Sequence, residues 1–152
     1  MWDQVVDFPF RGSAALTLDG KGRLTIPARF RERLTAGGIE VLVVTKAHAN
    51  RALVLFPPAR WEAFAERFDQ SANLEADAQR RWFVGSAIDV EIDAAARILV
   101  PPTLRDFARL ERDVVLLGLG HHFELWDAKL YADHEEQTLH ADLPQSLKAL
   151  SF

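Results

Sequence analysis

The feature that most constrains the fold of this chain is a pattern that occurs twice along it. Asp19 and Arg23 in the first half recur as Asp93 and Arg97 in the second. Each pair follows a run of alternating apolar residues and precedes an apolar residue joined to a proline. The two copies are offset by 74 residues at these pairs. Self-similarity of this kind, extending over about 45 residues, indicates an internal duplication.

A half of this size has about four short strands and one short helix, too little to bury its own apolar faces. We therefore expect the two halves to pair their strands around a pseudo-twofold axis and to form one small barrel, with helices packed outside it. The expected fold class is α+β, mainly β. The expected organisation is a first repeat over residues 13–60, a helical connector over 61–84, a second repeat over 85–129, and a C-terminal helix and tail over 130–152.

The first repeat also carries local signals. Apolar residues alternate on either side of the run Asp19-Gly20-Lys21-Gly22, which predicts a hairpin with a glycine-bearing turn. Pro27 suits the first turn of a helix, and Phe30 and Leu34, four residues apart, give that helix one apolar face. Further strands are predicted over 39–45 and 52–56, and further helices from Ala59 and over 71–83.

Three expectations concern the edges of these segments. Ser71 is a candidate N-cap for the second connector helix. Residues 1–9 contain two acidic residues and no uninterrupted apolar core, so they do not read as a signal peptide. Four apolar residues of the tail are candidates for docking on a neighbouring molecule: Leu143, Leu147, Leu150 and Phe152.

Positive charge is concentrated in one stretch of the first repeat. Residues 11–33 contain six basic and two acidic residues, a net charge of +4, whereas the whole chain carries −4 and the remainder therefore −8. A positive tip on an acidic protein is a localised site for an anion, and nucleic acid is the large anion that fits it best. The chain is therefore expected to bind nucleic acid.

The residues of this stretch and its repeat resemble the MraZ family of bacterial regulators. The resemblance covers residues 10 to about 130 and includes the duplication. It is carried by Phe10-Arg11-Gly12, Leu18-Asp19-x-Lys21-Gly22-Arg23-Leu24-x-Ile26-Pro27, Arg29-Phe30-Arg31, Asp93-x-x-x-Arg97 and Phe123-Glu124-Leu125-Trp126-Asp127.

This resemblance implies both a fold and a function. The implied fold is a swapped-hairpin, or double-split, β-barrel of the AbrB and MazE kind, with two AbrB-like repeats fused in tandem. The implied function is transcription regulation by a ring-shaped homo-oligomer. The ring would bind short direct repeats in promoter DNA upstream of its own gene, at the head of the gene cluster for division and cell-wall synthesis.

Six residues are the candidates for DNA contact: Arg11, Gly20, Lys21, Gly22, Arg23 and Arg29. An arginine at the tip of a two-stranded ribbon can make bidentate bonds with guanine, and a lysine meets phosphate as a point charge. Three residues are expected to orient this site: Asp19, Asp93 and Arg97. An aspartate that opens a turn accepts backbone N–H bonds and can hold the guanidinium four residues on. A direct base contact by Asp19 stays open as an alternative.

The second turn departs from the first. Ala94-Ala95-Ala96 stands where the first turn has Gly20-Lys21-Gly22, so both the lysine and the glycines are lost. If Gly22 has a positive φ, Ala96 in the matching position costs roughly 1 kcal/mol or forces another turn shape. Any contribution of the second half to DNA binding then depends on Arg97.

Composition argues against several other classes of protein. The chain has no cysteine, which excludes disulfides, thiolate zinc sites and cysteine nucleophiles. Adjacent His121 and His122 would point to opposite faces of a strand, which suits joint metal ligation poorly. No motif of a hydrolase or metalloprotease is present. We expect no enzymatic activity, no catalytic or metal site, no cofactor, no small-molecule substrate and no membrane segment, in a cytoplasmic, nucleoid-associated protein.

A second hypothesis from another class is a protein-interaction module. In this interpretation the chain is an antitoxin-like barrel whose acidic tail engages a basic protein partner. The position of the gene discriminates the two hypotheses: a neighbouring small toxin favours the interaction module, and a place at the head of a wall-synthesis cluster favours regulation.

Overall fold

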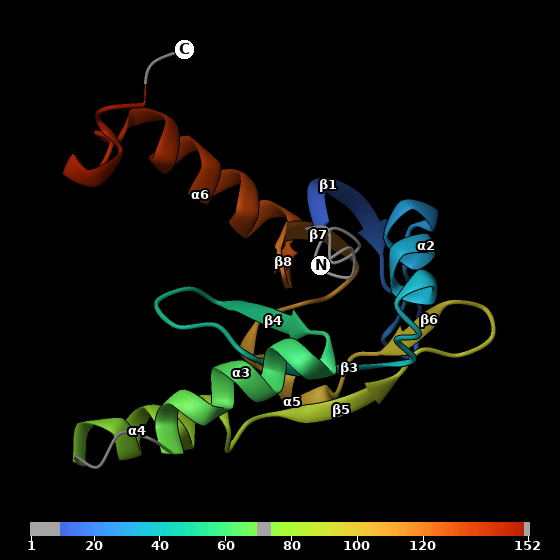
Figure 1. Cartoon of the computed structure of the whole chain (residues 1–152). Helices are drawn as coiled ribbons and strands as arrows, with labels where there is room; N and C mark the ends of the chain where they lie inside the picture. Colours follow the sequence, from blue (N-terminus) through green and yellow to red (C-terminus); the bar gives the residue numbers. More distant parts are fainter. Residues whose placement is uncertain (1–9, 70–73, 151–152) are drawn as a thin grey trace.

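The computed structural model describes residues 10–69 and 74–150 (Figure 1). The elements of the first repeat and the connector are β1 (Phe10–Thr17), β2 (Arg23–Thr25), α2 (Ala28–Ala36), β3 (Val41–Lys46), β4 (Ala52–Phe56), α3 (Pro58–Asp69) and α4 (Leu74–Phe83). The elements that follow are β5 (Ile88–Glu91), β6 (Arg97–Leu99), α5 (Pro102–Phe107), β7 (Asp113–Gly120), β8 (Phe123–Asp127), α6 (Ala128–His140) and the 3₁₀ helix η1 (Gln145–Leu147).

The strand order is symmetric: β1, β7 and β8 at one end of the large sheet are the equivalents of β5, β3 and β4 at the other. A six-stranded antiparallel sheet has the order β1-β7-β8-β4-β3-β5, and β2 pairs with β6 in a separate two-stranded sheet. The pairs β1–β7, β3–β5, β4–β8 and β2–β6 all join one half of the chain to the other. The α+β class, the predominance of strands and the pairing of two duplicated halves are therefore confirmed.

The local hairpin predicted around residues 19–22 is wrong. β1 pairs along all of its residues with β7, and β2 pairs with β6, so the two strands flanking the turn do not pair with each other. The physical reason is burial. A hairpin of one half would leave its apolar face exposed, whereas the exchange buries Leu24 of β2 against Ile98 of β6, with exposed fractions of 0% and 1%.

The core lies between the inner face of the large sheet and the β2–β6 ribbon. Each ribbon strand runs into a proline and then a short helix, Pro27 before α2 and Pro101 before α5. Phe30 and Leu34 of α2 are buried, as their spacing predicted, and Leu104 of α5 is their counterpart in the second half. These helices close the two ends of the ribbon and hold it against the sheet.

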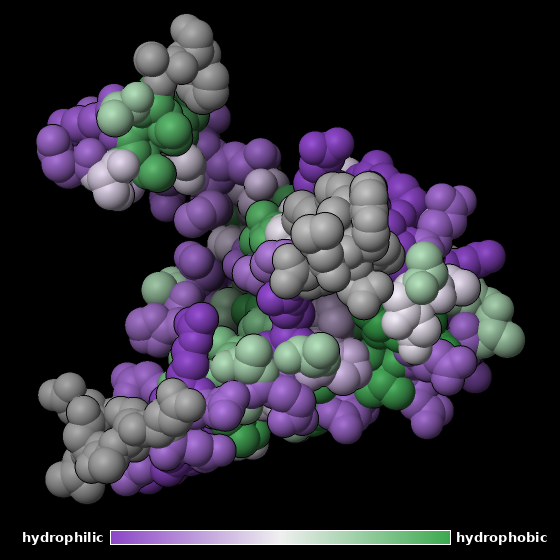
Figure 2. All heavy atoms as spheres, in the orientation of Figure 1, coloured by the Kyte–Doolittle hydropathy of each residue, from purple (hydrophilic) through white to green (hydrophobic). Residues whose placement is uncertain are grey.

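Two helical arms lie on the outer side of the large sheet, and α6 contacts the sheet through Leu130 and Tyr131 near its start before it extends away. Figure 1 shows α3 and α4 as one arm and α6 with the C-terminal segment as another, and Figure 2 shows a hollow between the two arms. The predicted connector helices correspond to α3 and α4, and the predicted polar C-terminal helix corresponds to α6, which begins at Ala128. Ser71, Phe152 and residues 1–9 lie outside the described residues, so the expectations placed on them stay predictions.

Candidate functional site

The first turn is organised by the Asp19 carboxylate. Its Oδ1 accepts hydrogen bonds from the backbone N–H of Lys21 at 2.9 Å and of Arg23 at 2.8 Å. Its Oδ2 accepts a hydrogen bond from Nε of Arg23 at 2.6 Å, which is also an ion pair. The backbone closes the turn with a bond from the Gly22 N–H to the Asp19 carbonyl. One side chain thus shapes the turn and fixes the direction of Arg23.

The second turn has the same geometry. Asp93 Oδ1 accepts from the N–H groups of Ala95 and Arg97 at 2.9 and 2.8 Å, and Oδ2 accepts from Arg97 Nε at 3.0 Å. Gly22 has φ +84° and Ala96 has φ +62°, so alanine adopts the left-handed conformation in this position. The turn shape is therefore retained without the glycine, at the strain cost that left-handed backbone imposes on an L-residue.

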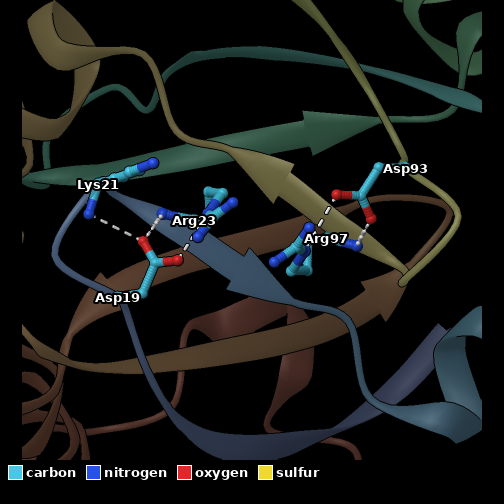
Figure 3. Close-up of polar contacts among 5 residues, drawn as sticks. All are labelled: Asp19, Lys21, Arg23, Asp93 and Arg97. Atoms are coloured by element: carbon cyan, nitrogen blue, oxygen red, sulfur yellow. Dashed lines mark hydrogen bonds and ion pairs between the residues drawn. The ribbon is translucent and has the colours of Figure 1, made fainter.

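Strand pairing brings the two turns together on one surface. Arg23 faces Leu99 and Thr25 faces Arg97 across the antiparallel ribbon, so both arginines lie on its outer face while Leu24 and Ile98 lie on its inner face. Figure 3 shows the side chains in the order Asp19, Arg23, Arg97, Asp93 across the ribbon, with Lys21 beyond the Asp19 end. The ribbon thus displays two carboxylate-held arginines related by the pseudo-twofold axis.

The electrostatics of the two pairs are alike. The hydrogen bond from the Arg23 backbone, assisted by the guanidinium, lowers the pKa of Asp19 from 3.8 to about 2. The corresponding bonds from Arg97 lower the pKa of Asp93. Both carboxylates are therefore ionised at neutral pH. Each contact uses only Nε of its arginine, and the terminal guanidinium nitrogens of Arg23 and Arg97 have no hydrogen-bond partner among the described residues.

The other residues of the first turn differ in accessibility. Gly20 and Lys21 are exposed at the tip, next to Arg23. Gly22 is buried, and a Cβ at this position would lie 2.4 Å from Cζ of Arg105, which packs over the turn from α5. The structure thus gives Gly22 two internal reasons to be glycine, its positive φ and the Arg105 guanidinium above it.

Arg11 and Arg29 are not brought to the turns. Arg11 is exposed near the start of β1, six residues before the end of that strand, which places it roughly 20 Å from the turn. Arg29 lies over β1, where its Nη2 donates to the Ser13 carbonyl at 2.6 Å and its guanidinium stacks 4.8 Å from the centre of the Phe30 ring. The six predicted contact residues therefore form two groups, the turn residues and a basic spot beside β1.

The described residues also bear on three other kinds of function: a metal site, a histidine site and a membrane-spanning helix. Those residues contain no group of three or more histidines and carboxylates placed to hold a metal ion. His121 is exposed and His122 half-buried in the β7–β8 loop, and burial lowers the pKa of His122. None of the helices in residues 10–69 and 74–150 has both the length and the hydropathy to span a membrane.

Sequence reasoning missed two features of this site. Arg97 was expected to orient the site and to carry any DNA contribution of the second half, but it was not placed on the same ribbon face as Arg23, which the repeated Asp-x-x-x-Arg spacing signalled. The packing of Arg105 on Gly22 had a weaker signal, the recurrence of Arg31 as Arg105 at the same offset of 74 residues. Both depend on contacts between halves, which no local pattern encodes.

Comparison with known proteins places the chain in a family. The family model described as "MraZ protein, putative antitoxin-like" matches residues 10–82 and again residues 83–150. A protein of Ralstonia pickettii named transcriptional regulator MraZ is 48% identical over 143 residues, covering 94% of this chain and 99% of its own length. Proteins of the same name from Burkholderia mallei and Paraburkholderia phytofirmans are 46% and 44% identical, with the same coverage. The chain belongs to the MraZ family.

Proposed function

We propose that this MraZ-family chain is a transcription regulator that binds double-stranded DNA through the outer face of its β2–β6 ribbon. The observation that carries the proposal is the pair of arginines on that face, Arg23 and Arg97. Each is held at Nε by a carboxylate, and each has terminal nitrogens without a partner among the described residues. The names of the relatives support the regulatory role.

The ribbon suits the major groove of B-DNA. This groove admits a two-stranded β-ribbon, and a guanidinium whose outer edge is open can make two parallel bonds to O6 and N7 of guanine. Asp19 and Asp93 reduce the number of orientations that the two arginines must give up on binding, which lowers the entropic cost. Lys21 at the tip suits a backbone phosphate. Arg11 of β1 and Arg29 of α2, whose guanidinium bonds to β1, lie away from the turn, where they suit phosphates outside the central contact.

Assembly supplies affinity in this proposal. One ribbon makes few base contacts, so several copies in a ring, each on one of a series of short direct repeats, would bind far more tightly than a single copy. We propose that these repeats lie in promoter DNA upstream of the chain's own gene, in the cluster for division and cell-wall synthesis. The protein then works in the cytoplasm, in association with the nucleoid.

The test is fluorescence anisotropy with a duplex from the region upstream of the gene. Arg23→Ala and Arg97→Ala should each weaken binding by roughly 5- to 150-fold, the range for losing one bidentate base contact. Lys21→Ala should weaken binding of all sequences alike and reduce the slope of log affinity against log salt by about 0.9 per subunit. Lys148→Ala removes the same charge from the exposed C-terminal segment and serves as the matched control.

Two results would contradict the proposal. Wild-type affinity in Arg23→Ala, with circular dichroism and assembly size unchanged, would show that the ribbon is not the DNA contact. Equal affinity for the upstream duplex and a scrambled duplex would show that binding has no sequence specificity. Failure to bind any DNA, together with a neighbouring toxin gene, would favour the antitoxin-like interaction module instead.

A further inference from the structure

The two helical arms occupy equivalent positions but are covered differently. α3 follows β4 as α6 follows β8, and β4 pairs with β8 across the pseudo-twofold axis. In the first arm, α4 packs against α3, with Phe83 at 5.3 Å from Phe64 and 5.8 Å from Phe68 between ring centres. Thr45 donates to the Phe83 carbonyl at 2.5 Å and is fully buried. α4 thus seals much of the sheet face beside α3.

No described helix plays the part of α4 beside α6. By strand register Ala47 corresponds to Leu119, yet Ala47 is 5% exposed and Leu119 is 44% exposed. Leu139 of α6 is 72% exposed. Together with Trp126 and Tyr131 these leucines line an open groove of about 720 Å³ between α6 and the sheet, the α6 groove. The chain therefore leaves apolar surface uncovered where its own first half covers the equivalent surface.

The α6 groove and its counterpart differ in charge. The α6 groove is lined by Glu124, Glu135 and Glu136, and no lysine or arginine is among the described residues that line it. The counterpart between α3 and β4, the α3 groove, has a volume of about 390 Å³. Its lining includes Arg60 and Arg67, and no acidic residue is among its described lining residues. Histidines line both grooves, His121 and His122 here and His134 in the α6 groove, so the difference in charge rests on the arginines and the glutamates. The two faces are complementary in charge although the fold makes them equivalent in position.

We propose that the α6 groove of one molecule receives the α3 groove face of a second copy of this chain. The contact joins two different surfaces, so it is head-to-tail, and repeated contacts of this kind close into a ring when the rotation allows. Burial of Leu119 and Leu139 supplies apolar area, and the glutamates meet Arg67 and its neighbours at the rim, where they set partner and register. The inference rests on the proposed ring and names the surfaces that form it.

The absence of cysteine from the chain makes a direct test possible. Ala63 lines the α3 groove and Leu139 lines the α6 groove, and both are exposed. With a short bis-maleimide, Ala63→Cys alone and Leu139→Cys alone should stay monomeric on a denaturing gel. The double variant should give a ladder of covalent multimers. Glu32→Cys combined with Leu139→Cys is the control, because Glu32 is exposed on α2 and lines neither groove.

A charge exchange provides the second test. Glu136→Arg and Arg67→Glu should each raise the concentration at which the assembly dissociates by about tenfold or more, measured by mass photometry. Combining both changes in one chain restores opposite charges at every contact and should return the assembly to within about threefold of the wild type. Glu32→Arg should leave it unchanged. Because Glu136, Arg67 and Glu32 are all exposed, none of these substitutions is expected to unfold the subunit.

The outcomes separate this inference from the proposed function. Dimers from Leu139→Cys alone would show a symmetric contact and overturn the head-to-tail assignment. A ring without cross-linking in the double variant, but with normal binding to the upstream duplex, would overturn the interface and leave the DNA proposal standing. A wild-type protein that is monomeric at all concentrations would overturn the interface and the ring together. Normal cross-linking without DNA binding would leave the interface and remove the DNA proposal.

Discussion

Substitution of Gly22 by alanine is expected to destabilise the protein through a contact between its two halves. Gly22 has φ +84°, and an added Cβ would lie 2.4–2.8 Å from three atoms of the Arg105 guanidinium. Atoms do not approach so closely, so the guanidinium must move. It is the end of a flexible side chain, with one long bond of 3.4 Å from Nη2 to the Val100 carbonyl, and it moves more readily than backbone would.

The expected magnitude follows from three contributions. An L-residue in the left-handed region costs about 1–2 kcal/mol. Alanine also restricts the unfolded chain, which returns about 0.4–1 kcal/mol. Displacing the Arg105 side chain from its rotamer costs about a further 0.5–1.5 kcal/mol. Together these ranges give a fall of about 0.5–3 kcal/mol in the free energy of unfolding, which corresponds to roughly 1–12 °C in melting temperature for a chain of this size.

The measurement is urea unfolding of Gly22→Ala beside a matched control in the same turn. Gly20 has no positive φ and no heavy atom within 4 Å of an added Cβ, so Gly20→Ala should be neutral or slightly stabilising. In an Arg105→Ala background, the cost of Gly22→Ala should fall to the backbone contribution, about 1 kcal/mol or less. Equal stability of Gly22→Ala and Gly20→Ala would refute the reasoning, as would an unchanged cost after removal of Arg105.

Three further predictions follow from single contacts. Asp19 has a folded pKa of about 2, below its unfolded value, so it stabilises the fold above about pH 4 and loses this effect as pH falls to 2. Wild type and Asp19→Asn should therefore differ in melting temperature at pH 7 and converge near pH 2. Thr45→Val should cost about 1–3 kcal/mol in urea unfolding and speed hydrogen exchange in α4, since it leaves the Phe83 carbonyl without its donor. Arg29→Ala should lower stability by about 1 kcal/mol through loss of its bond to Ser13, and should weaken DNA binding less than Arg23→Ala.

Local elements could be predicted from the sequence because their signals are local. The spacing of Phe30 and Leu34 located the buried face of α2, and the strand over 52–56 has the predicted bounds. The repeated pattern went further, since it predicted the pairing of the two halves. The Asp-x-x-x-Arg spacing also predicted the contact that the structure shows between the aspartate, the turn backbone and the guanidinium. Each of these signals lies within a few residues or within the repeat itself.

The partners of the strands could not be predicted in the same way. Apolar residues alternate in the strands beside residues 19–22 in the same way whether those strands pair with each other or with strands of the other half. The alternation therefore could not exclude a local hairpin, and that prediction was wrong. Burial of Leu24 against Ile98 decides between the two, and this is a property of the assembled core. The position of Arg29 was missed for a similar reason, because its bond to Ser13 joins segments sixteen residues apart.

The fusion of the two halves into one chain explains how equivalent surfaces acquired different chemistry. In a dimer of identical chains, positions related by the twofold axis carry the same residue, so the two grooves would carry the same charge and would repel each other. Here Val54 on β4 is matched by Glu124 on β8, which pair across the axis. The two turns also carry different residues at equivalent positions. Gly22 and Ala96 share a backbone conformation, but only the first turn has a lysine at its tip. Duplication followed by divergence thus lets one fold present a symmetric ribbon on one side and two complementary faces on its outer sheet.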